Sequence, residues 1–415
     1  MKVTNNRPLI PRSLLIFLVG VAFTEASRTM TMVQLPIFLR ALGADISQVG
    51  LFFTLSLAFP LILRIIGGWL SDTIGRLRAI WYGSLAGIAA YFFYTLASTW
   101  HMALLGPVFL AIASALFYPS YRAYIADTID EESIGRVFGI AETVRNIAWV
   151  IGPPFGGFLA LNFGYKWMFA AATISSCVAA MIFLFMTRSY APQNATQTER
   201  LNIASLRRSL QGIFVLIMSG GLVTWILITD GVYDIASRLS FDLMPVYLSD
   251  IVGFDNQQIG LLDMTFGIAW VMAGPLGGWL VDKASERVSI VIGLVLLISS
   301  RLTFAFAYAF GGFAFSWILL GLGGAMMNPA LNSIVAKGVP SHLRGITYAF
   351  LVTSVSLLAL PFPWIGSLIW EAIDPKAPFL ITVVAGSLAI IPAWLKLIVP
   401  EEPTPTTEQP ATTTN

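Results

Sequence analysis

Charged side chains recur at helical spacing inside runs of apolar residues. Glu25 and Arg28 lie three positions apart in one run, and Glu142 and Arg145 repeat that spacing in another. Residues three or four apart share one face of a helix, so each pair can form an ion pair. A carboxylate in a partly dehydrated cavity can also take up a proton near neutral pH. Two hypotheses therefore stand for these pairs: proton transfer, and a structural ion pair that only orders the helices.

A third group of charges has the same character. Asp230, Asp234 and Arg238 are spaced four apart in an apolar run. A charge at the centre of a bilayer costs at least ~2.5–3.5 kcal/mol, so such a residue faces a cavity or a partner. These three residues are therefore candidates for substrate or proton binding.

The composition places the chain in a membrane. Of its 415 residues, 57% are hydrophobic and only 11% are charged, whereas a soluble domain carries about 25% charged residues. A net charge of +2 does not indicate nucleic-acid binding, and 2 His and 1 Cys form no pattern of metal ligands. We expect an all-α membrane protein, because about 20 apolar residues cross a bilayer as a helix. Twelve transmembrane helices are expected, at about 12–39, 48–71, 77–98, 103–126, 137–162, 165–187, 212–248, 256–281, 287–309, 313–336, 343–370 and 377–399.

The basic residues predict the orientation. Lysines and arginines gather in the loops on one side of the predicted helices, and the opposite loops hold little more than Arg40, Lys166 and Lys376. Positive charge favours the cytoplasmic side, so both termini are expected there. The first residues lack the pattern of a signal peptide. We expect a monomeric multi-pass protein of a prokaryotic plasma membrane, the cell inner membrane.

A short sequence motif occurs twice in the chain. GGWLSD begins at Gly67 and GGWLVD at Gly277, 210 positions later, and Pro119 and Pro329 keep the same offset. Two six-helix halves built on one plan are typical of secondary transporters, whose substrate site lies where the halves meet. We expect an N-terminal half at 1–187, a cytoplasmic linker at 188–211, a C-terminal half at 212–400 and a disordered tail at 401–415.

The run GGWLSDTIGRLR, from Gly67 to Arg78, resembles the signature between helices 2 and 3 of the major facilitator superfamily. The resemblance covers nearly the whole chain and implies the twelve-helix fold with two pseudo-symmetric six-helix halves. It also implies that Asp72 and Arg76 latch a cytoplasmic gate; the simpler hypothesis is a tight turn that fixes topology. The second copy has Ser285 in place of the glycine, so its latch is expected to be weaker. The residues expected in the two gates are Gly68, Asp72, Gly75, Arg76, Asp127, Arg136, Asp282 and Arg344.

The run GPPFGG, from Gly152 to Gly157, resembles the glycine–proline signature that antiporters of this family carry in helix 5. Proline bends a helix by removing a backbone donor, and glycine lets two helices approach closely. The alternative is a bend that only shapes the contact between the halves. Besides Gly152 and Gly157, we expect Pro153, Glu142 and Arg145 on this interface helix.

The resemblance further implies that helices 1, 4, 7 and 10 line a central cavity. Glu25 is then the expected principal proton acceptor, with Arg28 as its modulator. Asp263 and Arg301 lie on helices that are less central, so structural roles are expected for them. The residues expected to bind protons or substrate are Glu25, Arg28, Asp230, Asp234, Arg238, Tyr118 and Asn328.

The expected function is secondary active transport, most simply proton-coupled export of small amphipathic compounds by antiport. The alternative is a proton-coupled uptake symporter, or an exchanger, of an organic anion or sugar, with Arg28 and Arg238 as a paired anion site. The chain lacks the arginine that drug antiporters of the family carry early in helix 4.

Other function classes find little support in the sequence. A transporter-like receptor is disfavoured, because no interior polar segment is long enough for a sensing domain. An ATP-driven pump is not expected, since the chain has no G-x-x-x-x-G-K-[ST] loop. We therefore expect no enzyme activity and no cofactor. The expected partners are a small-molecule substrate, protons that supply the driving gradient, and the lipid bilayer.

Overall fold

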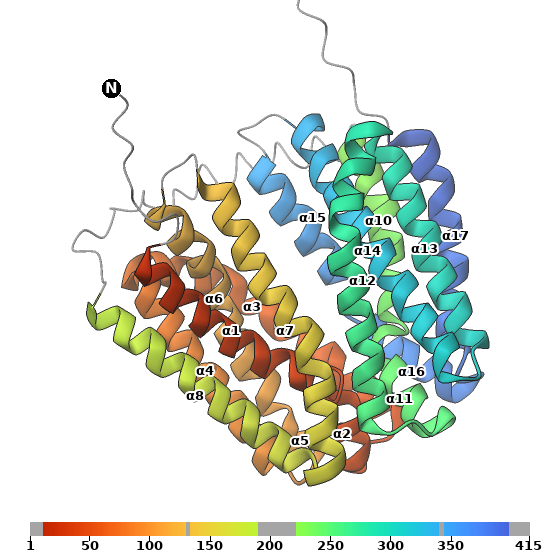
Figure 1. The fold of residues 1–415 in the computed structure, drawn as a ribbon. Coiled ribbons are helices and arrows are strands. Elements are labelled where there is room, and N and C mark those ends of the chain that lie inside the picture. The colour runs from red at the N-terminus through yellow and green to blue at the C-terminus, as the bar shows by residue number, and fades with distance from the viewer. Residues whose placement is uncertain (1–10, 130–132, 190–220, 340–343, 398–415) are drawn as a thin grey trace, which may run out of the picture.

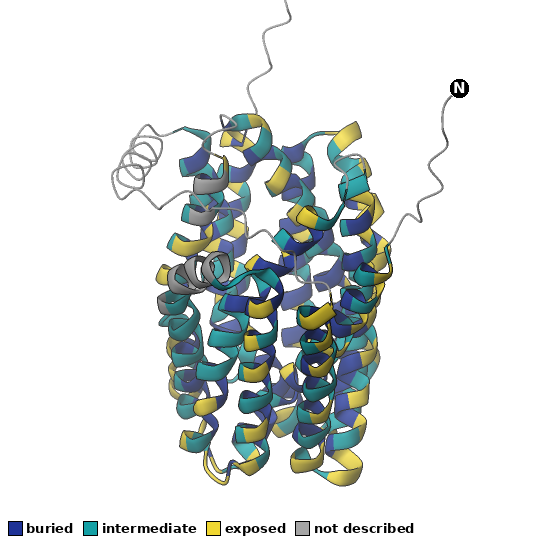
Figure 2. Ribbon diagram, turned by 90° about the vertical axis from the view of Figure 1, so that its left-hand side faces the viewer, coloured by how far each residue is buried: buried dark blue, intermediate teal, exposed yellow. Residues whose placement is uncertain are grey.

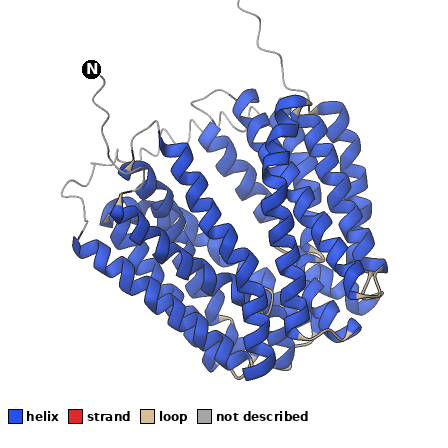
Figure 3. Cartoon of the chain, in the orientation of Figure 1, coloured by secondary structure: helices blue, strands red, loops and turns tan. Residues whose placement is uncertain are grey.

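The computed structural model describes residues 11–129, 133–189, 221–339 and 344–397, apart from the side chains of residues 62, 64–73, 345, 346 and 349. Helices contain most of these residues, and none of the described residues lies in a strand (Figure 3). The predicted all-α membrane fold is confirmed. The predicted linker and the predicted tail lie almost wholly outside the described residues.

The helices form two groups that follow one another along the chain (Figure 1). Nine helical spans in the described residues are long and apolar enough to cross a membrane. In addition, α3 and α7 have 29 and 30 residues, which is length enough to cross. The first group contains α1 (Arg12–Met32), α2 (Leu35–Ala41), α3 (Ile46–Ile74), α4 (Arg76–Leu96), α5 (Trp100–Ala103), α6 (Leu105–Thr128), α7 (Ile134–Phe163) and α8 (Tyr165–Ser189). The second group contains α10 (Leu222–Arg238), a 3-10 turn (Phe241–Leu243), α11 (Met244–Val246), a π-helical segment (Tyr247–Val252), α12 (Asn256–Lys283), α13 (Glu286–Phe306), α14 (Phe310–Gly338), α15 (Arg344–Ala359), α16 (Phe362–Ala372) and α17 (Ala377–Lys396).

Three predicted spans are broken in the structure. The first and eleventh, 12–39 and 343–370, are each divided into two helices, α1 with α2 and α15 with α16. The seventh, 212–248, leaves its regular helix at Arg238. Proline cannot donate the N–H that continues a helix, and its ring clashes with the preceding turn. A proline lies at or soon after each break: Pro36, Pro361 and Pro245.

The repeat found in the sequence is present in the helix ends. Asp45 and Asp255, 210 positions apart, begin α3 and α12 with the same capping box, in which each aspartate exchanges hydrogen bonds with the glutamine three residues on. Gly43 and Gly253 come two residues earlier, with φ angles of 84° and 82°. Glycine adopts such angles without steric cost. The two groups of helices are therefore built on one plan in detail.

Contacts at glycine join the two groups. Gly260 of α12 packs against the backbone carbonyl of Pro153 in α7, and Gly50 of α3 packs against the carbonyl of Pro363 in α16. The two contacts are equivalent in the repeat, because each residue of one pair stands 210 positions from its counterpart. A side chain at either glycine would occupy the space of the carbonyl. Small residues at such crossings let helix backbones approach closely.

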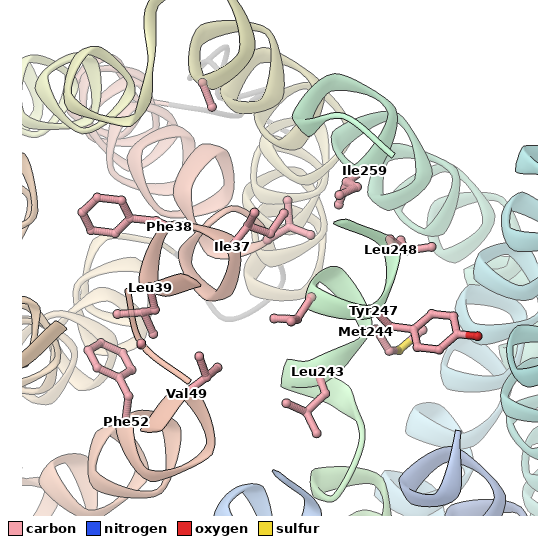
Figure 4. Close-up of a cluster of buried hydrophobic side chains, with 14 of the residues drawn as sticks. Ile37, Phe38, Leu39, Val49, Phe52, Leu243, Met244, Tyr247, Leu248 and Ile259 are labelled. Carbon is pink, nitrogen blue, oxygen red and sulfur yellow. The ribbon is translucent and has the colours of Figure 1, made fainter. Parts of the chain in front are cut away.

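Polar and apolar contacts between the groups lie at the same end of the bundle. Arg40 pairs with Asp250 at 2.7 Å, and the Gln34 side chain donates to the Asn256 carbonyl at 2.8 Å. Buried apolar side chains from both groups, Ile37 to Leu39 and Leu243 to Leu248 among them, face one another here (Figure 4). We call this the closed end.

Toward the opposite end, the helices of the two groups diverge (Figure 1). Each group has there a buried apolar cluster of its own, one around Phe17 and Phe183 and the other around Ile290 and Ile334. We call this the open end.

The outer surface of the bundle is apolar. Trp167, Ile174, Met272 and Val384 are each at least 60% exposed, and exposed residues follow the outer helices along their length (Figure 2). Apolar surface on this scale is unfavourable in water and favourable in lipid. The molecule is therefore a multi-pass membrane protein.

Adding one methyl group at Gly260 is expected to weaken the closed end. The new Cβ of Gly260→Ala would overlap the Pro153 carbonyl, and such overpacking typically costs ~1–3 kcal/mol. The closed end should open in a larger fraction of molecules. Spin labels at the exposed positions Lys166 and Asp374, in a Cys177→Ser background, report this as a longer electron–electron distance.

Gly274→Ala is the matched control. It lies on the same helix, but its Cβ would meet nothing within 4 Å. Identical distance distributions for the two variants would contradict a role of the Gly260 contact in closure.

Candidate functional site

A cavity of about 300 Å³ lies between the two halves, next to the closed end. One wall comes from α1, α2, α3, α4, α6, α7 and α8, and the other from the 3-10 turn, α11, α12 and α14. Tyr91, Met244 and Trp317 belong both to the cavity wall and to the apolar cluster of the closed end. The contacts that join the halves therefore also form one boundary of this central cavity.

Two carboxylates line the central cavity from the second half. Asp242 lies in the 3-10 turn and Asp263 in α12. Neither forms an ion pair with any residue that the structure describes. Trp317 lies within hydrogen-bonding reach of Asp263, and Arg28 acts on it electrostatically from the opposite wall. The charge of Arg238 acts on Asp242 in the same way. The second half thus presents two negative groups to the cavity.

Aromatic rings make up much of the remaining wall. The face of an aromatic ring carries negative partial charge and attracts cations. One ring already does so, because the Arg28 guanidinium lies 5.1 Å from the centre of the Trp149 ring. The aromatic residues of the wall are Phe53, Tyr91, Tyr94, Trp149, Phe169, Phe241, Phe266 and Trp317.

Glu25 is the centre of a charge network in the first half. Its side chain is 1% exposed and accepts hydrogen bonds from Arg28 at 2.7 and 2.9 Å and from Arg145 at 3.3 Å. Arg145 also binds Glu142 at 2.9 Å, and Tyr118 lies within hydrogen-bonding reach of Glu25. The two predicted pairs are therefore one network that ties α1 to α7. The role of Glu25 as a proton acceptor stays a prediction.

Only some of the predicted binding residues line a cavity in the structure. Arg28 lines the central cavity, and Tyr118 lines a second cavity inside the first half. The α10 helix ends at Arg238, so the residues after it, not those predicted on it, form the cavity wall. Asn328 is exposed and donates to the carbonyl of Gly324 in its own helix. The predicted residues that line neither of these cavities in the described structure are Glu25, Asp230, Asp234, Arg238 and Asn328.

The glycine–proline run of α7 lies where this helix contacts two others. Gly152 packs against Thr29 of α1, and Gly157 packs against the backbone of Asn256 in α12. Pro153 lines the central cavity. The run thus joins α7 to both halves. Its link to antiport stays a prediction.

The predicted gate of the first half lies at the open end. Arg76 Nε is 3.7 Å from a carboxylate oxygen of Asp127, which is 62% exposed. Exposed ion pairs contribute little, about 0–1 kcal/mol. Gly75 ends α3 with a φ of 90°, an angle that favours glycine. The side chain of Asp72 lies outside what the structure describes, as do the surroundings of Gly68, so their gating role stays a prediction.

The second half has a matching contact with its charges exchanged. Glu286 and Lys337 stand 210 positions after Arg76 and Asp127, and their side chains are 2.6 Å apart. The Glu286 carboxylate is 8% exposed and also accepts from Ser333 at 2.8 Å. This pair is closer and more buried than its counterpart, contrary to the expectation of a weaker second gate.

The second copy of the motif has Ser285 where the first has Gly75, and the backbone conformation explains this difference. Its φ of 169° is ordinary extended backbone, so this turn does not need the glycine that the first copy uses. Arg344 donates to the Val339 carbonyl at 3.0 Å. The remaining predicted gate residues are exposed on helices of the open end: Arg136, Asp282 and Arg344.

Two cavity residues were missed or misplaced by the sequence analysis. Asp242 was not identified, and Asp263 was assigned a structural role. Asp242 comes three residues before Pro245, and this proline was a signal that regular helix ends there. Asp263 and Phe266 share one helix face by their spacing, and that face lines the cavity.

Two structurally related halves around a shared cavity define a membrane transporter. The sequence model of the Major Facilitator Superfamily matches residues 17–236 and 231–414. The chain therefore belongs to this superfamily, whose members are transporters rather than enzymes.

Curated relatives include bacterial drug-resistance proteins. The quinolone resistance protein NorA of Staphylococcus aureus is 27% identical over 165 residues, which are 40% of this chain and 41% of NorA. The chain thus matches about two fifths of NorA. A multi-drug resistance efflux pump PmrA homolog of Lactococcus lactis is 25% identical over 398 residues, 92% of both chains.

Solved structures share the fold at low identity. A bacterial homolog of the human lysosomal transporter Spinster, in an inward-facing and unoccupied conformation, has a TM-score of 0.73 and 15% identity over 94% of this chain and 98% of its own. A variant of the peptide transporter POT in complex with alafosfalin has a TM-score of 0.72 and 14% identity over 93% and 94%. At this identity the likeness shows the fold alone.

Glu25→Gln is expected to lower the melting temperature more than Glu142→Gln. The first change removes the negative charge between Arg28 and Arg145, and hydrogen bonds to charged groups contribute about 1.5–3 kcal/mol. The second affects a carboxylate that is 47% exposed and can be replaced by water. Thermal unfolding of the purified variants at pH 8 measures both. Equal melting temperatures for the two variants would show that Glu25 is not the centre of the network.

Proposed function

We propose that the protein exports small amphipathic cations across the plasma membrane in exchange for protons. One observation carries this proposal: Asp242 and Asp263 line the central cavity without an ion pair in the described structure, among aromatic rings. Both side chains are partly buried, and a charge removed from water without an ion-pair partner is costly, so a cationic ligand that supplies the partner is favoured. The aromatic faces bind the same ligand through cation–π contacts. Two of the relatives, a quinolone resistance protein and a multi-drug resistance efflux pump homolog, support the export of small drug-like compounds.

Uptake or exchange of an organic anion or sugar has less support. The anion site of that alternative needed Arg28 and Arg238 together. Arg28 is bound by Glu25, and Arg238 does not line the central cavity. The carboxylates of the second half would also repel an anion.

Arg28 connects the proton site to the substrate site in this proposal. Its Nε and Nη2 both donate to Glu25, and its charge also acts on Asp263. Protonation of Glu25 removes the negative partner that holds Arg28 in place. The guanidinium then neutralises Asp263 and displaces a cationic ligand. One proton taken up by Glu25 thus releases one cation from the cavity.

The groups around Glu25 determine which side chain loses its ion-pair partner when Glu25 is protonated. Arg145 and Glu142 face it from α7, Tyr118 from α6 and Tyr91 from α4. Arg145 retains Glu142 as a partner when Glu25 becomes neutral. Arg28 has no second carboxylate within ion-pair distance among the described residues. Protonation of Glu25 therefore leaves Arg28, but not Arg145, without a carboxylate partner among the described residues.

The proposed direction follows from the predicted orientation. With both termini in the cytoplasm, the open end faces inward, and a cation enters the central cavity from the cytoplasm. Opening of the closed end then releases it outside, and the inward proton gradient drives the cycle. Each step uses one chain and no cofactor, so we propose that the protein works as a monomer.

Asp263→Asn is expected to weaken binding of a lipophilic cation such as tetraphenylphosphonium. Loss of a charge-assisted contact of about 1.5–3 kcal/mol corresponds to roughly ten- to hundredfold lower affinity. Asp263→Glu keeps the charge and should retain most of the binding. Titration calorimetry of the protein in nanodiscs at pH 8 compares the variants. Unchanged affinity in Asp263→Asn would overturn the substrate site.

The same titrations at pH 6 and pH 8 test the coupling. The unchanged protein should bind the cation more tightly at pH 8 than at pH 6, because antiport requires that a bound proton and a bound cation exclude each other. Glu25→Gln mimics the protonated state, so its affinity should be low and equal at the two pH values. If this variant keeps the pH dependence of the unchanged protein, Glu25 is not the proton acceptor.

A further inference from the structure

A second cavity, of about 290 Å³, lies inside the first half among α1, α3, α4, α6 and α8. We call it the N-half chamber. Small residues provide its space, because a glycine or alanine at a helix contact leaves volume that a larger side chain would fill. Those of α4, α6 and α8 are Gly83, Gly87, Ala111, Ala113 and Ala179.

Most polar groups on the chamber wall already have partners, and the buried hydroxyl of Tyr94 is the exception among the described residues. Four hydroxyl groups donate to backbone carbonyls of their own helices, and that of Ser176 donates to Ser27. The Arg28 guanidinium is bound by Glu25. A wall on which most donors are used offers little to water, and largely apolar cavities accept apolar ligands. The four residues with internally bonded hydroxyls are Thr24, Ser56, Ser84 and Ser114.

The N-half chamber adjoins the central cavity. Six residues line both spaces, and five of them are apolar or aromatic side chains. A ligand in the central cavity therefore meets the chamber across a largely apolar boundary, at the level of Arg28. The six are Arg28, Leu35, Phe53, Tyr91, Tyr94 and Leu110.

We propose that the N-half chamber is a subsite for the apolar part of the substrate, while the cationic part lies between Asp242 and Asp263. This inference rests on the proposed function and specifies its substrate class: amphipathic cations with an alkyl chain or ring system apart from the charge. The charged end is recognised by the second half and the apolar end by the first. Each buried methylene then adds about fourfold to the affinity until the chamber is full.

A series of alkyltrimethylammonium ions, from butyl to decyl, tests the subsite in the full chain in nanodiscs. Gly87→Leu places a larger side chain in the chamber, and its Cβ meets nothing within 4 Å, so the backbone need not move. This variant should bind butyltrimethylammonium like the unchanged protein and decyltrimethylammonium at least tenfold more weakly. The comparison between proteins cancels the partition of each cation into lipid.

Gly274→Leu is the matched control. It is exposed on α12, its Cβ also meets nothing within 4 Å, and it lines neither cavity. It should leave the dependence on chain length unchanged. Equal affinities of Gly87→Leu and the unchanged protein for decyltrimethylammonium, or an equal loss for butyl and decyl, would overturn the subsite alone. If the unchanged protein binds none of these cations, the proposed function fails and the subsite fails with it.

Discussion

The close approach of helix backbones at the closed end is the constraint on which the rest of the structure depends. Gly260 meets the Pro153 carbonyl, and Gly50 meets the Pro363 carbonyl, where no side chain has room. Both contacts lie in the stretch where the halves are also joined by an ion pair and an apolar cluster. Because these contacts join the halves at one end, the halves can diverge toward the other end and leave a cavity between them.

The two halves differ in how their buried and partly buried carboxylates are paired. Glu25 accepts hydrogen bonds from two arginines, so its charge is compensated within the first half. Asp263 has only Trp317 within hydrogen-bonding reach and a cation on the far wall. An ionised group in that position gains from any mobile cation. The buried carboxylate of the first half is thus paired within the protein, whereas the two carboxylates on the cavity wall of the second half have no ion-pair partner among the described residues.

The sequence predicts the fold because the repeat holds its register through packing contacts and helix caps, as Asp45 and Asp255 show. It predicts the candidate site less well for two reasons. Hydrophobic runs do not show where a helix ends inside a span. The regular helix α10 ends at Arg238, and the cavity is therefore lined by Asp242 rather than by the residues predicted on α10. Helical spacing shows which residues share a face of a helix, but not whether that face lines a cavity. The position of Asp263 on the cavity wall therefore could not be predicted from the sequence. The ion pair of Glu286 and Lys337 is equivalent to that of Arg76 and Asp127, but with the charges exchanged. A comparison of residue types between the halves does not reveal it, because the charge at each position differs.

A ligand that bridges the two halves is also suited to alternating access. Its charge would be held at Asp263 by α12 and its apolar part by the N-half chamber, whose walls belong to the first half. Separation of the halves at the closed end pulls these two subsites apart, so neither half alone keeps the full affinity. A ligand shifts an equilibrium only by its different affinity for the two states. The division of the binding energy between the halves supplies that difference, with tight binding when the closed end is shut and release when it opens.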